Sequence, residues 1–585
     1  MRGSREWVLR WCAVVLGCAL VAGVGFLAIH GAGPKARAAD PTSPAAGTDP
    51  AGDRRDPEKT RTPSPAAAAM PDQPNIVMVM ADDMRVDDLA FAPHLRRLIA
   101  RHGVSFENSF SPFPLCCPAR ASFLSGQYAH NHKVLWHDPP FGYGAFDDSR
   151  TLATSLHRAG YRTGFIGKYL NHYGKDLSKV TGAPSYTYVP QGWDDWRGAI
   201  ENPGNAPFHG DTYNYYDTPF NVNGVVDNRY RGVYQSNVIG DFSVDMAHRF
   251  SHKRKPFFIY VNYVAPHHGD PQDPTFPRGV LDRTGRPIPL VTPAVPDSVR
   301  GRFDRRIRRG AGIAREGEPV EVDRTDKPPE IQKRSFRLTR EARTALRDAT
   351  RRRAEAVYVM DRNIARLVRQ LKRTGEWRRT VFMFTSDNGL IMGEHGFGMT
   401  KVRAYEPSLR VPLLVTGPGL RTAQKRYDPI STVDLTATLL DLGDARAPRP
   451  ADGISRLSTL LEGDQGWTTP VVTEAIRTSG GNDPAFTDRR TTIGIRVSRY
   501  SYTRYRDGTA ELYDLATDPR QDTNVADAGE YADVRSALDR IWPRLKNCKA
   551  ARCRTPLPAV LAADPTTNCA DTERYWSAIR AAYGW

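Results

Sequence analysis

The sequence predicts an α/β fold, with a large, mostly parallel sheet flanked by helices and a smaller antiparallel sheet after it. Continuous apolar runs begin at Pro74, Tyr161, Pro256 and Thr380, and a strand buried on both faces of a parallel sheet needs such a run. Residues 339–376 carry Leu, Ala, Val and Met at helical spacing, which indicates a long helix before the last of these strands.

Shorter runs near the C-terminus alternate between apolar and polar residues. Residues 491–497 and 500–506 show this alternation, which predicts antiparallel strands with one face in water. The Pro-rich segment 445–450 precedes them and predicts a boundary. A chain of 585 residues, of which 40% are apolar, can bury at least one large core, and we expect two domains.

Composition and pattern divide the chain into five segments. We predict a signal peptide or N-terminal anchor in residues 1–38, a disordered Pro- and Ala-rich linker in 39–73, a large domain in 74–445, an antiparallel subdomain in 446–547 and a cysteine-containing tail in 548–585. Inside the large domain, residues 282–336 are rich in Pro and Arg and lack apolar periodicity. They predict a basic insertion, for which a solvated loop is the simpler explanation.

The N-terminus has the pattern of an export signal. Arg2, Arg5 and Arg10 precede an apolar run over residues 11–29, and Ala-Arg-Ala at 36–38 resembles a cleavage site. The run is also long enough to remain in a membrane as an uncleaved anchor. We therefore expect an exported protein, secreted or attached to the cell surface. The sequence has no Asn-x-Ser/Thr acceptor site, which favours a bacterial source.

The cysteines and the net charge leave several options open. Cys548, Cys553 and Cys569 lie near the C-terminus, where an exported protein could join two of them, but the spacing does not decide which. The formal net charge of +17 suits an anionic partner, such as a nucleic acid, an acidic lipid or a sulfated glycan. We expect no nucleic acid, because no recognised motif accompanies the charge. Membrane contact is expected only through an N-terminal anchor.

Oxygen-bearing side chains follow two of the predicted strands. Asp82 and Asp83 follow the first, and Asp387 and Asn388 follow the last. Ligands of open α/β sheets bind beyond the carboxyl ends of the strands, where these residues would be. Hard oxygen donors without a soft ligand suit Ca²⁺ or Mg²⁺, and of the two we expect Ca²⁺.

A cysteine at the start of a predicted helix is the candidate nucleophile. Cys116 stands two residues before Pro118, and proline suits the first turn of a helix. The thiol is therefore expected near free backbone amides and the positive end of the helix dipole. Arg120 lies one turn further along and adds a positive charge. A buried, inert cysteine is the alternative that these residues alone leave open.

The segment from Cys116 to Gly126 resembles the sulfatase signature, with Cys-x-Pro-Ala-Arg followed by Ser-Phe-Leu-Ser-Gly. The resemblance implies an α/β sandwich of the alkaline-phosphatase type with a smaller antiparallel subdomain. It also implies that Cys116, and not Cys117, is oxidised by a formylglycine-generating enzyme to formylglycine. The hydrated aldehyde would then be the nucleophile.

The resemblance extends to the predicted cation site. Ile-Val-x-x-x-Ala-Asp-Asp and Ser-Asp-Asn-Gly are similar to the metal-binding segments of the family. The resemblance thus implies that Asp82, Asp83, Asp387 and Asn388 hold the divalent cation together with the modified Cys116.

Further site residues are implied by the same resemblance. His267, in Ala-Pro-His, is expected to protonate the departing alcohol. Lys168 and Lys401 are expected to hold the sulfate, together with Arg120. His395 is expected to line the pocket.

One position departs from the commoner family pattern. A histidine usually stands two residues after the lysine, and here that position is Leu170. Residues 169–171 (Tyr-Leu-Asn) and 127–132 resemble the glucosamine-6-sulfatase branch instead. Asn171 or His172 is therefore expected to bind the substrate in place of the usual histidine.

These features predict hydrolysis of sulfate monoesters on a carbohydrate, with the 6-sulfate of N-acetylglucosamine or a related glycan favoured. One alternative is a phosphomonoester, phosphodiester or phosphonate hydrolase on the same scaffold. The other is an unmatured surface protein that binds glycans without catalysis, against which the metal ligands argue. We also hypothesise that the arginines within residues 300–309 form a rim that steers a polyanionic glycan toward the pocket.

Overall fold

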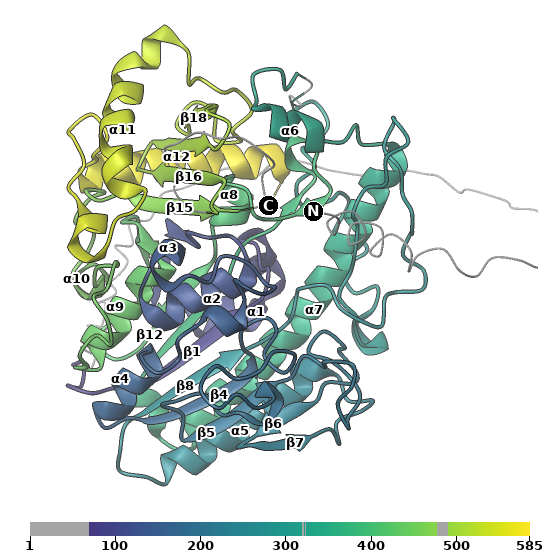
Figure 1. Cartoon of the computed structure of the whole chain (residues 1–585), viewed down its shortest axis with the longest axis vertical. Coiled ribbons are helices and arrows are strands. Elements are labelled where there is room, and N and C mark those ends of the chain that lie inside the picture. Colours follow the sequence, from purple (N-terminus) through teal and green to yellow (C-terminus); the bar gives the residue numbers. More distant parts are fainter. Residues whose placement is uncertain (1–68, 319–320, 322, 477–488, 585) are drawn as a thin grey trace, which may run out of the picture. The chain divides into compact units, whose positions relative to one another are not determined.

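Ten strands form the large sheet, in the order β13-β2-β12-β9-β1-β8-β4-β5-β6-β7 (Figure 1). The central five are parallel to one another: β9 (Thr380–Ser386), β1 (Asn75–Ala81), β8 (Phe257–Asn262), β4 (Arg162–Lys168) and β5 (Asp195–Ala199). Shorter strands extend both edges: β12 (Leu413–Thr416), β2 (Val104–Phe106) and β13 (Gln424–Arg426) beyond β9, and β6 (Phe220–Val222) and β7 (Val225–Asp227) beyond β5. The predicted mostly parallel sheet is confirmed.

The structure is a computed structural model, and it describes residues 69–318, 321, 323–476 and 489–584. The predicted signal or anchor segment and nearly all of the predicted linker lie outside the described residues. Within the described ranges, no helix is both long and apolar enough to cross a bilayer.

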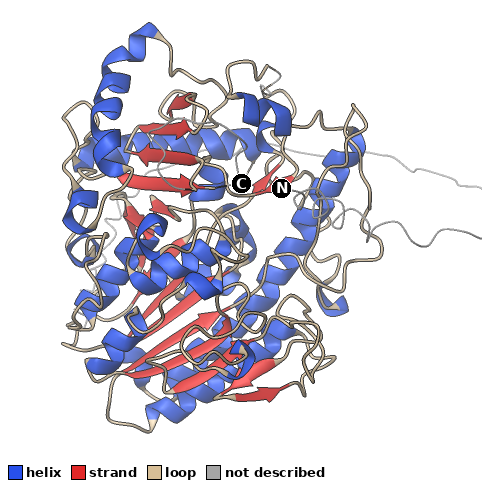
Figure 2. Ribbon diagram, viewed as in Figure 1, coloured by secondary structure: helices blue, strands red, loops and turns tan. Residues whose placement is uncertain are grey.

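Helices cover both faces of the large sheet, as Figure 2 shows. On one face lie α1 (Pro93–Leu98), α5 (Gln235–Ser251) and α7 (Arg340–Arg373), and on the other lie α2 (Cys116–Ser125), α4 (Leu152–Arg158) and α9 (Thr432–Leu442). Side chains of β1 alternate between the two cores, with Val77 and Val79 toward α5 and α7, and Ile76 and Met78 toward α2 and α9. Burial on both faces explains the continuous apolar run.

The predicted long helix is α7, and local signals set its ends. Thr339 caps its first turn by accepting a hydrogen bond from the backbone N–H of Ala342. Gly375, at φ 78°, follows the helix in the left-handed conformation that glycine adopts at little cost.

The C-terminal sheet is antiparallel, as predicted, but neither face lies in water. Its strands are β15 (Val471–Ala475), β16 (Thr492–Arg496), β17 (Tyr500–Tyr505) and β18 (Ala510–Asp514), and nearly all of their residues are buried. One face packs on α11 (Ala532–Leu545). On the other face, Arg496 donates to Glu406 at 2.7 Å, and Glu511 accepts from the hydroxyl of Tyr405 at 2.7 Å. The prediction of a wet face is therefore wrong, because the polar alternation marks a buried, paired interface with the large domain.

The remaining strands and α-helices of the described residues are the C-terminal helix α12 and several short elements. They are β3 (Ser109–Phe110), β14 (Ile430–Ser431), β10 (Ile391–Met392), β11 (Met399–Thr400), α3 (Ala129–His132), α6 (Pro329–Arg334), α8 (Glu406–Leu409), α10 (Leu457–Leu461) and α12 (Pro565–Tyr583). Cys548 and Cys553 form a disulfide, which answers the pairing question left open by the spacing, and Cys569 is a free thiol.

The insertion 282–336 is mostly loop, as its composition predicts. Several of its arginines are engaged within the fold: Arg300 pairs with Asp273, and Arg302 and Arg306 each lie over an aromatic ring. The steering role proposed for these arginines stays a prediction.

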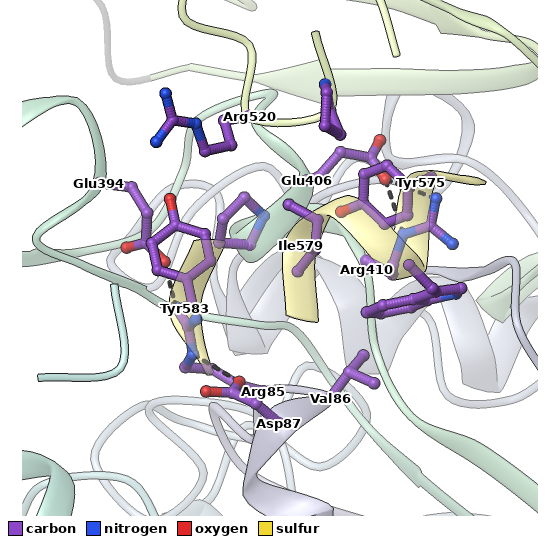
Figure 3. A pocket seen from close by; sticks show the side chains of 13 residues that line it. Arg85, Val86, Asp87, Glu394, Glu406, Arg410, Arg520, Tyr575, Ile579 and Tyr583 are labelled. Atoms are coloured by element: carbon purple, nitrogen blue, oxygen red, sulfur yellow. Dashed lines mark hydrogen bonds and ion pairs between the residues drawn. The ribbon is translucent and has the colours of Figure 1, made fainter. Parts of the chain in front are cut away.

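The C-terminal helix α12 packs beside two loops that leave the large sheet, around a small cavity (Figure 3). Tyr575 and Tyr583 of α12 line the cavity, together with Arg85, Glu394 and Arg410. Arg85 donates to Glu394 at 2.8 Å, which ties the loop after β1 to the loop after β9. The cavity measures about 30 Å³, which has room for about one water molecule and not for a substrate.

Candidate active site

Four parallel strands end at one edge of the large sheet, and each leads into a residue singled out from the sequence. The strands β9, β1, β8 and β4 are neighbours in this order, so their carboxyl ends lie side by side. Asp387 follows β9, Asp82 and Asp83 follow β1, His267 comes after β8, and Lys168 is the last residue of β4. The topology thus gathers residues that are far apart in the sequence.

Helix α2 brings Cys116 to the same edge. The helix begins at Cys116, as predicted, and the residue is fully buried. Its Sγ lies 3.1 Å from Oδ1 of Asp82 and 3.9 Å from Oδ1 of Asp83. The Nζ atom of Lys401 lies 2.8 Å from the same sulfur. Cys117 packs in the hydrophobic core instead, so of the two adjacent thiols it is Cys116 that faces the polar site.

Each carboxylate at this edge has a cationic partner. The pairs are Lys168 with Asp82, Lys401 with Asp83, and Arg120 with Asp387, the last at 2.8 Å between Nε and Oδ2. These three carboxylates therefore face three positive side chains, and their charges balance before any divalent cation or anionic substrate binds. Adding a divalent cation would leave the site positive and suited to an anion.

The neighbouring charges set the pKa values of the buried carboxyl groups. Burial raises the pKa of Asp82, but the charge of Lys168 and its neighbours outweighs this effect, and the pKa lies well below its ordinary value. At Asp83, burial is likewise outweighed, chiefly by Lys401, and the pKa falls to about 2. At Asp387, burial and the charge of Asp82 raise the pKa to about 6. A nearby cation would favour its ionised form.

A buried amide oxygen identifies where a cation fits. Asn388 donates from Nδ2 to Oδ1 of Asp83 at 2.6 Å, while its own buried Oδ1 has no hydrogen-bond partner among the described residues. Leaving such an oxygen unpaired is costly, and a divalent cation would satisfy it. Ligand atoms of Asp82, Asp83, Cys116 and His267 all lie within 4.8 Å of one another. The residues present therefore fit one divalent cation.

His267 lies beside this cluster. Its Nε2 is 3.6 Å from Oδ2 of Asp83, and its Nδ1 donates to the carbonyl oxygen of His268 at 2.7 Å. This hydrogen bond orients the ring with Nε2 toward the cluster. Burial lowers the pKa of His267 to about 4, against the opposing charges of Asp82 and Asp83.

The family model described as "Sulfatase" matches residues 74–445, which is more than half of the chain. The chain belongs to the sulfatase family. Members of this family are sulfuric ester hydrolases, and the resemblance found in the sequence is confirmed. A second model, described as the C-terminal part of N-sulphoglucosamine sulphohydrolase, matches residues 393–549 of this sulfatase.

Curated relatives include N-acetylglucosamine-6-sulfatases from distant organisms. The Homo sapiens N-acetylglucosamine-6-sulfatase is 25% identical over 523 residues, covering 83% of this chain and 86% of the relative. The N-acetylglucosamine-6-O-sulfatase of Bacteroides thetaiotaomicron is 26% identical over 515 residues, covering 80% and 85%. An extracellular sulfatase SULF-1 homolog of Drosophila melanogaster is 29% identical over 400 residues, and the match spans 66% of this sulfatase but 31% of the fly protein.

Solved structures share the fold of this sulfatase. A protein in complex with its substrate D-glucosamine-2-N,6-O-disulfate superposes with a TM-score of 0.55 at 22% identity, covering 81% of this chain and 98% of that one. The phosphonate monoester hydrolase of Silicibacter pomeroyi gives a TM-score of 0.59 at 21% identity, covering 84% and 99%. The predicted α/β sandwich with an antiparallel subdomain is thereby confirmed.

Asn171 is connected to the cluster through Tyr213. Its Nδ2 donates to the Tyr213 hydroxyl at 2.6 Å, and the Tyr213 ring lies 5.0 Å from Nζ of Lys168 and 5.0 Å from the His267 ring. The Oδ1 of Asn171 is buried, and the Asn171 side chain also hydrogen-bonds to His137. The amide therefore links Tyr213 and His137 beside the cluster.

His172 and His395 were also expected to bind the substrate. Both contact carboxylates that lie outside the cluster. His172 lies between Asp138 at 3.0 Å and Asp176 at 3.1 Å. The Nδ1 of His395 is 2.8 Å from Glu321, in a group separate from the Asp82 cluster. Neither contact supports a role in the pocket, and both roles stay predictions.

Sequence reasoning missed Tyr213 and His137. Tyr213 lies in the connection between β5 and β6. No periodicity or motif distinguishes it from the other 23 tyrosines of the chain. His137 follows α3, and burial and the charges of Lys401 and Lys168 lower its pKa to about 3. The only sequence signal for His137 was its closeness to the segment 127–132, which resembles one branch of the family.

Proposed function

We propose that this sulfatase hydrolyses sulfate monoesters with residue 116, in its formylglycine form, as the nucleophile. The observation that carries the proposal is the position of the Cys116 side chain, whose sulfur lies 3.1 Å from Asp82 and 2.8 Å from Lys401. A glycan-binding surface protein would have no use for a buried nucleophile position among carboxylates that fit a divalent cation. Catalysis therefore accounts for this arrangement better than binding alone.

Maturation of Cys116 is part of the proposal. An unmodified thiol offers one attacking group and would remain trapped as the sulfated enzyme. A hydrated aldehyde carries two hydroxyls on one carbon, so one can attack sulfur and the other can then expel sulfate and restore the aldehyde. A separate formylglycine-generating enzyme would have to carry out this oxidation before the protein becomes active.

The proposed cofactor is one divalent cation, Ca²⁺ rather than Mg²⁺. It would be held by Asp82, Asp83, Asp387 and Asn388 together with residue 116. When bound, it lowers the pKa of a nearby hydroxyl and offsets the negative charge of the ester.

The remaining site residues act on the substrate's anion and its leaving group. Lys168, Lys401 and Arg120 would hold the sulfate oxygens, because their positive charges converge at this edge of the sheet. His267, whose Nδ1 hydrogen is held by the His268 carbonyl, would donate a proton from Nε2 to the departing oxygen in its imidazolium form, which the negative charge of a bound ester favours. Asn171, which the Tyr213 hydroxyl holds beside the cluster, would hydrogen-bond a sugar hydroxyl.

The proposed substrate is a sulfated carbohydrate, with the 6-sulfate of N-acetylglucosamine favoured. Two relatives that cover four fifths or more of this chain's length are named for that activity. A protein of the same fold has D-glucosamine-2-N,6-O-disulfate as its substrate. The Tyr-Leu-Asn variant at residues 169–171 agrees with this choice.

The test compares paired substrates on protein produced with a formylglycine-generating enzyme. We expect release of sulfate from N-acetylglucosamine-6-sulfate and a higher kcat/KM on nitrophenyl sulfate than on nitrophenyl phosphate or a phosphonate monoester. Cys116→Ala should abolish turnover, while Cys117→Ala, a matched change one residue along in the core, should retain it. A clear preference for the phosphorus esters would select the phosphonate or phosphate hydrolase instead.

We also propose that the protein is exported, to the cell surface or the medium. The basic and apolar pattern of residues 1–38 supports export. So does the disulfide between Cys548 and Cys553, since disulfides persist in oxidising compartments. Retention of the protein in the cytoplasm of its own host would contradict the proposal.

A further inference from the structure

The C-terminal half of α7 carries a row of arginines outside the candidate active site. Arg362, Arg366, Arg369 and Arg373 follow one another at spacings of four, three and four residues, which puts them on one face of the helix. Three of them are exposed, and Arg366 is half-buried. Lys372 is exposed next to this row.

The row lines a series of open hollows between α7 and its neighbours. A hollow of about 670 Å³ is bordered by Arg362, Arg366 and Arg369 from α7, by His94 from α1, and by Pro296 from the insertion. Two more hollows, of about 570 and 450 Å³, also include Arg366 and Arg373 in their linings. Because the three hollows share lining residues, they adjoin and form one groove, which we call the basic groove.

The arginines of the groove have fewer carboxylate partners than the arginines in the first half of the same helix. Arg347, Arg351, Arg352 and Arg353 each lie within 4 Å of a carboxylate. In the groove, Arg366 pairs with Asp241 at 2.5 Å. Arg362 and Arg369 have no carboxylate partner among the described residues. The groove therefore presents an excess of positive charge.

This arrangement is not explained by the stability of the helix. Like charges one turn apart repel each other and destabilise a helix. The helix dipole favours cations in the last turn, which accounts for Lys372 and Arg373 but not for Arg362, three turns earlier. The positive field also reaches His94, whose pKa is lowered by burial and by Arg97, Arg369 and Arg362. An anionic ligand would relieve this repulsion.

We propose that the basic groove is an exosite for an extended sulfated polysaccharide. Guanidinium groups bind sulfate oxygens through paired hydrogen bonds, and arginines three or four residues apart on a helix lie about 5–6 Å apart, so they can contact successive anionic groups. The proposal rests on the proposed function, which makes a sulfated glycan the substrate of the same protein.

Two other polyanions fit the groove less well. Single-stranded nucleic acid binds by stacking its bases on aromatic rings, and none of the residues lining the three hollows is Phe, Tyr or Trp. A membrane surface is held by exposed apolar side chains next to basic ones, whereas this site is hollowed and mostly polar. The basic, mostly polar lining of the hollows favours a flexible chain that carries sulfates.

The exosite would act by tethering a polymer near the active site. Arg353, on the same helix, donates to the backbone oxygen of Asp83 at 2.7 Å, and Arg362 and Arg373 lie about 14 Å and 30 Å further along the helix axis. A chain held in the groove keeps its other sulfates at a raised local concentration near the site. The exosite should therefore lower the KM for a polymer without changing turnover of a monosaccharide.

The test neutralises two exposed arginines of the groove in the full chain, as Arg362→Gln/Arg369→Gln. Arg340→Gln/Arg343→Gln is the matched control, because it removes the same charge from exposed positions of the same helix outside the hollows. Fluorescently labelled dextran sulfate is titrated at several salt concentrations. We expect the groove variant to bind about ten-fold more weakly, with the slope of log K against log salt reduced by about two, and the control to change little.

Two outcomes would overturn the proposal. Equal losses in the groove and control variants would mean that the charge acts diffusely and that no site exists. A groove variant that keeps its affinity for dextran sulfate but loses affinity for DNA or for anionic phospholipid vesicles would assign the groove to a different partner. The binding is read without turnover, so failure to hydrolyse N-acetylglucosamine-6-sulfate would refute the proposed function while the groove result stands separately.

Discussion

Glu474 provides a quantitative test of how the C-terminal sheet is joined to the large domain. This fully buried residue of β15 accepts hydrogen bonds from the backbone N–H of Ala129 at 3.0 Å and from Nδ1 of His130 at 2.6 Å. It also pairs with Arg490. Glu474→Gln keeps the shape of the side chain but removes its charge, which leaves two buried basic groups without their carboxylate.

The pKa of Glu474 gives the expected magnitude. Burial raises this pKa, but the charges of His130 and Arg490 outweigh the effect and lower it from 4.5 to about 2. That difference corresponds to about 3 kcal/mol, which agrees with the usual cost of breaking a buried ion pair. We therefore expect Glu474→Gln to reduce the free energy of unfolding by about 3 kcal/mol at pH 7. For a folded part of roughly 500 residues, this lowers Tm by about 3 °C.

The pH dependence follows from the direction of the shift. Because the folded pKa lies below the unfolded value, the stabilisation is present above about pH 4.5 and is lost as the pH falls toward 2. Thermal unfolding followed by fluorescence at pH 7, 5, 4 and 3 measures the difference between wild type and variant. Glu530→Gln, at an exposed position, is the matched control. The reasoning is refuted if Glu474→Gln changes Tm no more than the control, or if the difference grows as the pH falls.

Three further predictions concern the site and its surroundings. His267→Ala should slow esters with poor leaving groups by about 10²- to 10⁴-fold and nitrophenyl sulfate far less, and equal losses on both would remove the proton-donor role. Asn388→Ala removes the unpartnered oxygen and should weaken Ca²⁺ binding, measured by calorimetry on metal-stripped protein, by about ten-fold or more; an unchanged affinity would exclude Asn388 as a ligand. Neutralising the exposed Arg305, Arg308 and Arg309 should lower activity on a sulfated polymer at low salt but not on a monosaccharide, and unchanged polymer activity would end the rim hypothesis.

The sequence predicted the centre of the fold well, because the centre is where local pattern and tertiary environment agree. β1 and β9 are buried on both faces, and this burial requires the continuous apolar runs that predicted them. Both strands end in carboxylates at one edge because parallel neighbours share a direction. The helix that begins at Cys116 was likewise predicted, since Pro118 in its first turn is a local signal.

The contacts that the sequence did not predict join residues that are far apart in the chain. The polar residues of the C-terminal sheet alternate as a wet face would, yet Arg496 is buried against Glu406, 90 residues away. No local rule distinguishes an exposed arginine from one with a distant buried partner. Tyr213 was missed for the same reason, since only the folded chain brings its ring within 5.0 Å of Lys168. His395 was predicted to line the pocket; its ring contacts Glu321, which the sequence did not indicate, and the pocket role stays a prediction.

Residue 116 is proposed to become the catalytic aldehyde, and the mass of one peptide decides whether it does. The protein would be isolated from its own host, its activity on a sulfate ester recorded, and the tryptic peptide that contains Cys116 weighed. We expect a peptide about 18 Da lighter than the thiol form, because conversion of cysteine to formylglycine removes that mass. A thiol at full occupancy in a preparation that hydrolyses sulfate esters would contradict it.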